Sequence, residues 1–218
     1  MTYLTMFEKL FENDKCLIIN KPNGISVHNA EDESVLEKYK KSGKKYFAVH
    51  RIDKETSGIL ILAKESTFVE ELSISLKSAT KSYLAICKGR FSNKKGLFNN
   101  KISDKSEGRK NPAGVTSNRK EASTFWEVEK ETKFFTELLV SIKTGRTHQI
   151  RKHCLINKTP IIGDQRYGDT KYNKKIASIY NTNAMALHAY KLVIIIDSNE
   201  MEITCDRPDH FITLMEMK

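Results

Sequence analysis

The sequence lacks any hydrophobic run long enough to span a bilayer. The longest candidate, LVIII at 192–196, is far shorter than the roughly 20 apolar residues of a membrane helix. The N-terminal stretch MTYLTMFEKLFENDK mixes acids with apolar residues and lacks the basic start and apolar core of a signal peptide. Cysteines are few and widely spaced, which excludes a zinc cluster or a disulfide framework: Cys16, Cys87, Cys154 and Cys205. We therefore expect a soluble, cytoplasmic protein.

Basic residues are in excess. Lys and Arg number 37 against 27 Asp and Glu, so the formal net charge is +10. A basic excess attracts polyanions, and phosphate contacts dominate non-specific affinity for nucleic acids. A generic solubility surface explains the same composition equally well. Charge alone therefore points toward a nucleic-acid partner without establishing one.

Short apolar runs bounded by turn residues predict a β-rich fold. The expected strands are 15–19, 45–49, 58–63, 82–87, 122–128, 135–142, 184–196 and 201–205. Helices are expected at 66–79, from about Thr147 with Thr144 or Thr147 as its cap, and at 209–217. Because strands outnumber helices without a regular βαβ order, we expect an α+β fold with a mixed, mostly antiparallel sheet flanked by helices. The polar stretches 92–121 and 163–183 are interpreted as functional loops, and residues 1–218 as a single domain.

The segment HRIDKETSG at 50–58 concentrates polar groups between two apolar strands. It offers cations, carboxylates and hydroxyls, and loops held by a rigid scaffold often carry catalytic groups. The competing interpretation is a tight turn with a weak Arg51–Asp53 surface pair.

This segment resembles the His-Arg-Leu-Asp-x-x-Thr-Ser-Gly signature of RluA-type pseudouridine synthases. Ile52 stands in place of the usual Leu, which preserves volume. Further blocks are similar to those of the family in the same order: INKPNGISVH at 19–28, KSYLAICKG at 81–89, IKTGRTHQIRKH at 142–153, PIIGDQRYG at 160–168 and LHAYKL at 187–192. The resemblance covers about residues 14 to 205.

The resemblance implies an enzyme that isomerises chosen uridines in structured RNA. The bond from ribose C1′ to uracil N1 breaks, the base turns, and C1′ joins C5. Nothing is oxidised and no high-energy bond is spent, so no cofactor and no metal are expected. Asp53 would act as the catalytic carboxylate, either as a nucleophile at C1′ or as a base that gives a glycal. Arg146 matches the arginine that pairs with this carboxylate, a task suited to a guanidinium fork.

Tyr83 matches the family tyrosine that packs against the target base and helps remove the C5 proton. Without the resemblance, a core-facing strand tyrosine is the default interpretation. The target uridine must be flipped outward, and Arg51 is a candidate to enter the gap it leaves.

Other residues of these blocks are expected to bind or orient the substrate. His50 and His148 are expected to orient or hydrogen-bond rather than to act as acid–base catalysts. Thr56 and Ser57 are expected to shape the Asp53 loop through side-chain-to-backbone bonds. The remaining candidates for substrate contact are Lys21, Gln149, Arg151, the basic loop 101–120, and Lys171, Lys174 and Lys175.

Other functions predict different chemistry. A protein-kinase loop is excluded because Ile52 separates Arg51 from Asp53 and no Gly-rich phosphate loop is present. A non-catalytic RNA-binding module would not need Asp53, Tyr83 and Arg146 together. A ribonuclease would use His50 and His148 as acid and base. Many relatives carry an N-terminal S4 domain, which is not expected here, so the catalytic domain and its loops are expected to recognise a compact stem-loop in tRNA or rRNA. A monomer is the default expectation.

Overall fold

The computed structural model describes residues 6–28 and 33–216, and its backbone divides into two compact units. Unit 1 comprises Met1–Lys81 and Ala189–Asp206, and unit 2 comprises Ser82–His188 and Arg207–Lys218. The chain passes from one unit to the other three times: within strands β5 (Thr80–Lys88) and β11 (Leu187–Ile196), and between Asp206 and Arg207.

In unit 1 the strands follow the order β1-β2-β4-β11, with β3 paired to β4 and β12 paired to β11. Their bounds are β1 Glu8–Glu12, β2 Cys16–Lys21, β3 Phe47–Ala48, β4 Ser57–Ala63 and β12 Asn199–Thr204. All seven residues of β4 are buried, as expected for a central strand.

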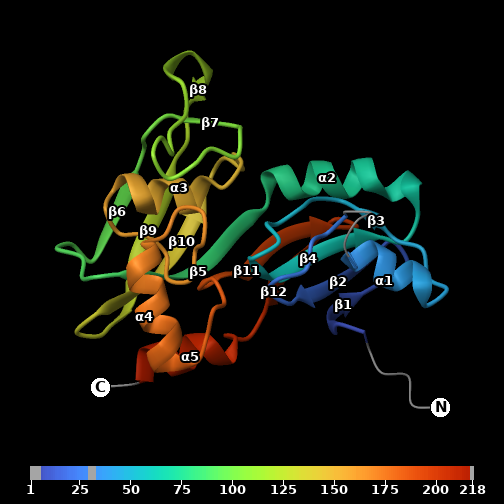
Figure 1. Cartoon of the computed structure of the whole chain (residues 1–218). Helices are drawn as coiled ribbons and strands as arrows, with labels where there is room; N and C mark the ends of the chain where they lie inside the picture. The colour runs from blue at the N-terminus through green and yellow to red at the C-terminus, as the bar shows by residue number, and fades with distance from the viewer. Residues whose placement is uncertain (1–5, 29–32, 217–218) are drawn as a thin grey trace. The chain divides into compact units, whose positions relative to one another are not determined.

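Two helices belong to unit 1, α1 (Val35–Lys41) and α2 (Val69–Ser78), the latter preceded by a 3₁₀ turn at Ser66–Phe68. Ser34 caps α1 by accepting a hydrogen bond from the backbone N–H of Glu37. Val35 and Tyr39 of α1 pack with Leu17, Ile19 and Leu60 in one apolar cluster, and Figure 1 shows α1 beside β1 and β2.

In unit 2 the strand order is β5-β10-β9-β6, and β7 and β8 form a separate two-stranded sheet. The bounds are β6 Lys95–Phe98, β7 Ile102–Ser103, β8 Arg119–Lys120, β9 Thr124–Glu131 and β10 Phe135–Ile142. The helices are α3 Gln149–Ile156, α4 Thr170–Tyr180 and α5 Asp209–Glu216. Helix α3 contacts β9 and α5 contacts β10 (Figure 1).

The expected α+β fold with a mostly antiparallel sheet is confirmed, and every strand pair whose register is described is antiparallel. The prediction of a loop at 163–183 is wrong, because α4 occupies most of it and buries Asn173 and Ile176. The 92–121 stretch is not simply a loop either, since β6, β7, a 3₁₀ turn at Thr116–Asn118 and β8 lie within it. Strand β1 and helix α1 were not predicted. Residue 217 of the expected last helix lies outside the described residues.

No helix in residues 6–28 and 33–216 is both long and apolar enough to cross a membrane.

Candidate functional site

The segment HRIDKETSG joins β3 to β4 in unit 1, and His50 fixes where it leaves the sheet. Strand β3 pairs with β4 only at Ala63 and Leu62. The residue of β4 that precedes Leu62 is Ile61, and its backbone N–H donates to His50 Nε2 at 3.0 Å. The imidazole thus replaces a strand partner and orients the start of the loop.

Burial, together with the nearby charge of Lys81, lowers the pKa of His50 to about 4. His50 is therefore neutral near pH 7, and its Nε2 is the hydrogen-bond acceptor. Because Nε2 accepts this backbone hydrogen bond, it has no proton to donate, which disfavours the ribonuclease alternative. The expected orienting role agrees with these contacts.

Asp53 lies at the turn of the loop. Its backbone carbonyl accepts a hydrogen bond from Thr56 N–H at 3.0 Å. Thr56 and Ser57 are buried, Asp53 is half-buried, and Arg51 is exposed. The loop therefore has a fixed end at Thr56 and Ser57 and an accessible one at Arg51.

Gly58 ends the motif and brings β4 against β11. Its φ is +106°, and a Cβ at this position would lie 2.3 Å from the carbonyl oxygen of Ala189. Only glycine tolerates both the backbone conformation and the close approach.

Lys21, at the end of β2, lies fully buried beneath the same loop. Its ammonium donates to three backbone carbonyls: Pro22 at 2.9 Å, Ile25 at 2.8 Å and Lys54 at 3.1 Å. Burial lowers the pKa of Lys21 to about 8, an effect opposed by the negative charges of Glu55 and Asp53. Lys21 thus ties the turn after β2 to the residue next to Asp53. Its expected contact with substrate stays a prediction.

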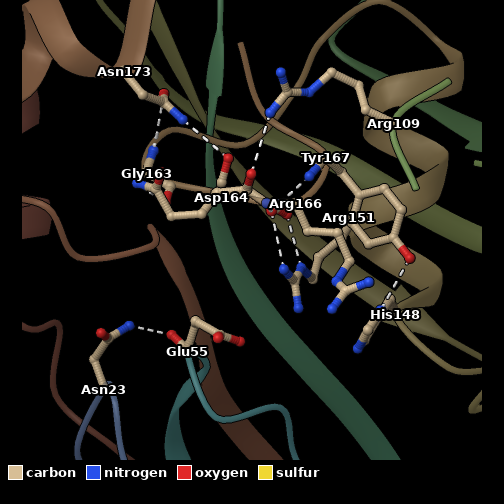
Figure 2. A network of polar contacts seen from close by, with 11 residues as sticks. Asn23, Glu55, Arg109, His148, Arg151, Gly163, Asp164, Arg166, Tyr167 and Asn173 are labelled. Atoms are coloured by element: carbon tan, nitrogen blue, oxygen red, sulfur yellow. Dashed lines mark hydrogen bonds and ion pairs between the residues drawn. The ribbon is translucent and has the colours of Figure 1, made fainter. Parts of the chain in front are cut away.

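Two further bonds join these turns. Gly24 N–H donates to the carbonyl of Lys54 at 2.9 Å, and the Asn23 amide donates to the carbonyl of Glu55 (Figure 2). The KPNG turn and the Asp53 loop therefore form one bonded assembly within unit 1.

The other two predicted catalytic residues lie in unit 2. Tyr83, on β5, pairs with Val140 of β10 and is half-buried. Arg146 lies between β10 and α3, with its side chain 31% exposed. Its guanidinium lies 3.3 Å from Asp104 and donates to the carbonyl of Glu121 at 3.4 Å. A hydrogen bond from Lys120 and the charge of Arg146 lower the pKa of Asp104.

Gln149 fixes the backbone of Arg146. Its Oε1 accepts from the Arg146 N–H at 3.2 Å and from the Thr144 hydroxyl at 2.7 Å. Its Nε2 donates to the carbonyl of Ser123 at 2.9 Å and to the hydroxyl of Thr124 at 3.1 Å. With 3% of its surface exposed, Gln149 supports the Arg146 loop from within. Its expected contact with substrate stays a prediction.

Helix α3 starts differently from the expectation. Its N-cap position is His148, with left-handed backbone at φ 55°, and no side chain caps it. A cap by Thr144 or Thr147 is therefore wrong, since Thr144 bonds to Gln149 instead. His148 Nδ1 lies 3.0 Å from the hydroxyl of Tyr167 (Figure 2).

Arg151 and Asp164 form a buried, two-pronged ion pair, at 2.7 and 2.9 Å. The Asp164 carboxylate also accepts from the backbone N–H groups of Arg166 and Tyr167, both at 2.9 Å (Figure 2). Removing one partner of such a pair would cost about 3–5 kcal/mol, because a buried charge would be left uncompensated. Arg151 therefore holds the turn after α3, and its contact with substrate stays a prediction.

Lys152 and His153 were not predicted to matter, yet both are fully buried. Lys152 donates to the carbonyls of Ser103 and Lys105, each at 2.8 Å. His153 Nε2 lies 2.9 Å from the carbonyl of Asn100, so this nitrogen carries the proton, while Nδ1 accepts from Thr124 at 2.8 Å. Burial lowers the pKa of His153. These bonds anchor the basic segment of residues 99–120 to α3. In the sequence, the only sign of this role is that Lys152 and His153 belong to the IKTGRTHQIRKH block.

Each unit therefore gathers part of the predicted set. Unit 1 joins Lys21, His50, Asp53, Thr56 and Ser57 around one loop. Unit 2 places Arg146, Gln149 and Arg151 at the start of α3. Within the described residues, no cluster of three or more His, Cys, Asp or Glu side chains could hold a metal ion.

Comparison with known proteins identifies a family. Residues 15–155 match the family model described as RNA pseudouridylate synthase. A ribosomal large subunit pseudouridine synthase C from Buchnera aphidicola subsp. Acyrthosiphon pisum (strain APS) is 33% identical over 207 residues, covering 91% of this chain and 66% of that protein. The Escherichia coli (strain K12) protein of the same name is 32% identical over 192 residues, 84% of this chain and 60% of its own. This chain thus spans less than two thirds of these relatives' length.

The fold also matches solved structures. Human RNA Pseudouridylate Synthase Domain Containing 1 superposes with a TM-score of 0.76 at 21% identity, over 93% of this chain and 84% of that chain. Human RNA Pseudouridylate Synthase Domain Containing 4 gives 0.76 at 22% identity, over 94% and 90%. The motif order, the fold and the family model agree, and this chain belongs to the RNA pseudouridylate synthase family.

Proposed function

We propose that this protein isomerises specific uridines in structured RNA to pseudouridine, with residues 1–218 acting as one catalytic domain. The observation that carries the proposal is the HRIDKETSG loop, where a turn, a buried lysine and a half-buried histidine hold the backbone around Asp53 in a chain of this family. Fixed positioning of a reacting group can supply a large part of a rate enhancement.

The reaction needs no outside reagent. The C1′–N1 bond breaks, C1′ bonds to C5, the C5 proton leaves and N1 gains a proton, so atoms and electrons balance within one nucleoside. Asp53 starts the reaction, either by bonding to C1′ or by taking a ribose proton. The positive charge of Lys21 attracts that carboxylate.

The roles of the other residues follow from the family resemblance and from their chemistry. Arg146 is proposed to pair with the Asp53 carboxylate during the reaction, and its contact with Asp104 would then be exchanged or shared. Tyr83 is proposed to stack against the flipped base and to assist loss of the C5 proton. Arg51, exposed on the loop, is proposed to fill the gap left by the base.

The substrate is proposed to be ribosomal or transfer RNA. The names of the relatives state that those proteins act on the ribosomal large subunit, which favours rRNA. A cytoplasmic, monomeric enzyme that works without metal or cofactor completes the proposal.

The test uses RNA tritiated at uracil C5. Wild-type protein should release the label without shortening the RNA. Asp53→Asn should bind RNA but release essentially none, because the amide can neither bond to C1′ nor accept the ribose proton. Asp14→Asn, an exposed change in unit 1 with the same loss of charge, is the matched control and should retain release.

Substantial label release by Asp53→Asn would refute the proposed role of the carboxylate. If wild-type protein binds RNA without releasing label, the chain is a binding module. If it shortens the RNA, it is a nuclease.

A further inference from the structure

Unit 2 has a cationic depression whose lining does not include Tyr83 or Arg146, the residues of this unit proposed to take part in the reaction. A depression of about 630 Å³, open to solvent, is formed where four chain segments meet. Its charged lining is Lys88 at the end of β5, Arg109 of the 99–120 segment, Lys158 after α3, and Asp169 and Lys171 at the start of α4. Four cations therefore face one carboxylate, in a space within the usual size range of ligand sites, about 300–1,000 Å³.

Only one of these cations is neutralised. Lys88 pairs with Asp169 at 2.8 Å and lies 4.5 Å from the centroid of the Tyr172 ring. Within the described residues, no carboxylate forms an ion pair with Arg109, Lys158 or Lys171. Asp169 also accepts the Tyr172 N–H at 3.0 Å, so it already caps α4. Because Asp169 already occupies the N-terminus of α4, we attribute the affinity of the depression for anions to its cationic side chains and not to that helix end.

Hydrogen bonds hold the guanidinium of Arg109 and the backbone of Lys158. The Arg109 guanidinium donates to the carbonyl of Gln165 at 3.1 Å and to the hydroxyl of Thr170. Lys158 has left-handed backbone at φ 62°, and its N–H donates to the carbonyl of Leu155 at 2.9 Å. The Arg109 guanidinium is held in place before a ligand arrives, so it loses less entropy on binding an anion.

The geometry points to the ligand: we propose that this depression binds phosphodiester groups of the RNA backbone, on the same substrate whose uridine is isomerised. The inference rests on the proposed function. Among the described residues, the lining has no aromatic ring on which a base could stack, whereas it offers the Lys and Arg donors typical of phosphate contacts.

The position suits a contact remote from the reacting nucleotide. Arg146 precedes α3 and Lys158 follows it, and a helix of eight residues is about 12 Å long. The backbone of Lys158 therefore lies about one helix length along α3 from that of Arg146. A contact there raises affinity and sets the register of the RNA without touching the reacting base.

The test compares two double variants with equal loss of charge. Lys158→Gln/Lys171→Gln removes two exposed cations of the depression that make no described ion pair. Lys130→Gln/Lys133→Gln removes two exposed cations of the β9–β10 hairpin in the same unit. RNA binding is measured over a range of salt concentrations, and tritium release is measured at varied RNA concentration.

The depression variant should bind RNA about three- to tenfold more weakly at physiological salt, with a log–log salt slope shallower by about 1 to 2. Its KM should rise while kcat stays within about twofold, because the contact acts equally on bound substrate and transition state. The hairpin variant should behave like wild type.

Equal affinities and salt slopes for the two double variants would overturn the inference. So would a depression variant that loses binding of inorganic phosphate but keeps RNA affinity, since the site would then serve a small anion. If wild-type protein releases no tritium, the proposed function fails, and this is distinct from a catalytically active wild type whose depression variant is unchanged.

Discussion

Replacing Gly58 with alanine should destabilise unit 1 severely. The backbone there has φ +106°, a conformation that costs a non-glycine residue about 1–3 kcal/mol. The new Cβ would lie 2.3 Å from the carbonyl oxygen and 2.7 Å from the nitrogen of Ala189, so β4 and β11 must separate. Each ladder hydrogen bond weakened in this way contributes about 0.5–1.5 kcal/mol. We expect a total loss of about 4 kcal/mol or more in the free energy of unfolding.

Two other glycines separate the contributions. Gly89 has φ +86°, and nothing lies within 4 Å of the place a Cβ would take, so Gly89→Ala should lose only the conformational part, about 1–3 kcal/mol. Gly108 has neither feature, and Gly108→Ala should change stability by less than about 1 kcal/mol. Urea unfolding of the three variants, followed by circular dichroism, measures the series.

A Gly58→Ala variant no less stable than Gly89→Ala would refute the reasoning, because it would show that β4 and β11 separate at no cost. If the prediction holds, the glycine of the motif is explained by backbone packing, and Asp53 sits on a loop whose far end cannot shift.

Two more predictions follow from polar side chains that hydrogen-bond to the backbone. Gln149→Leu should reduce the free energy of unfolding by about 2–4 kcal/mol, because the Ser123 carbonyl and the Thr124 hydroxyl lose their donor. The same variant should have a lower kcat at temperatures where it stays folded. Unchanged stability in urea would contradict this. The pKa of His50 is lowered to about 4 in the folded state, so the unfolded chain takes up the proton first and stability is lost as the pH falls from about 6.5 toward 4. Between pH 7.5 and 5 the wild type should therefore lose about 2 kcal/mol more than His50→Gln, whose amide does not titrate; parallel pH profiles would refute the assignment.

The central strands could be predicted from the sequence because strands that are buried on both faces consist almost entirely of apolar residues. Strand β4 is buried along its whole length, and its run GILILA is apolar throughout. Strand β1, EKLFE, has no fully buried residue, so no hydrophobic pattern marks it. Helix α4 buries only Asn173 and Ile176, and its many polar residues led to the prediction of a loop.

The site was predicted in part for a similar reason. The motif identified Asp53 and its neighbours because residue types and spacing are local properties of the chain. The partners of Lys21 include the carbonyl of Lys54, 33 residues away, and those of Lys152 lie 47 and 49 residues away. A sequence carries no sign of which distant carbonyl a lysine will reach, so a role in substrate binding was the natural expectation for Lys21.

Helix α3 has a consequence for how mutational surveys of this protein should be interpreted. Its buried residues include four polar ones, Gln149, Arg151, Lys152 and His153, and each hydrogen-bonds to a part of unit 2 outside the helix. A hydropathy scale would rank this stretch as surface, whereas a substitution scan would find nearly every position intolerant. A catalytic centre would give the same pattern of inactive variants. Loss of activity in an α3 variant therefore indicates a catalytic role only where the variant is also shown to fold.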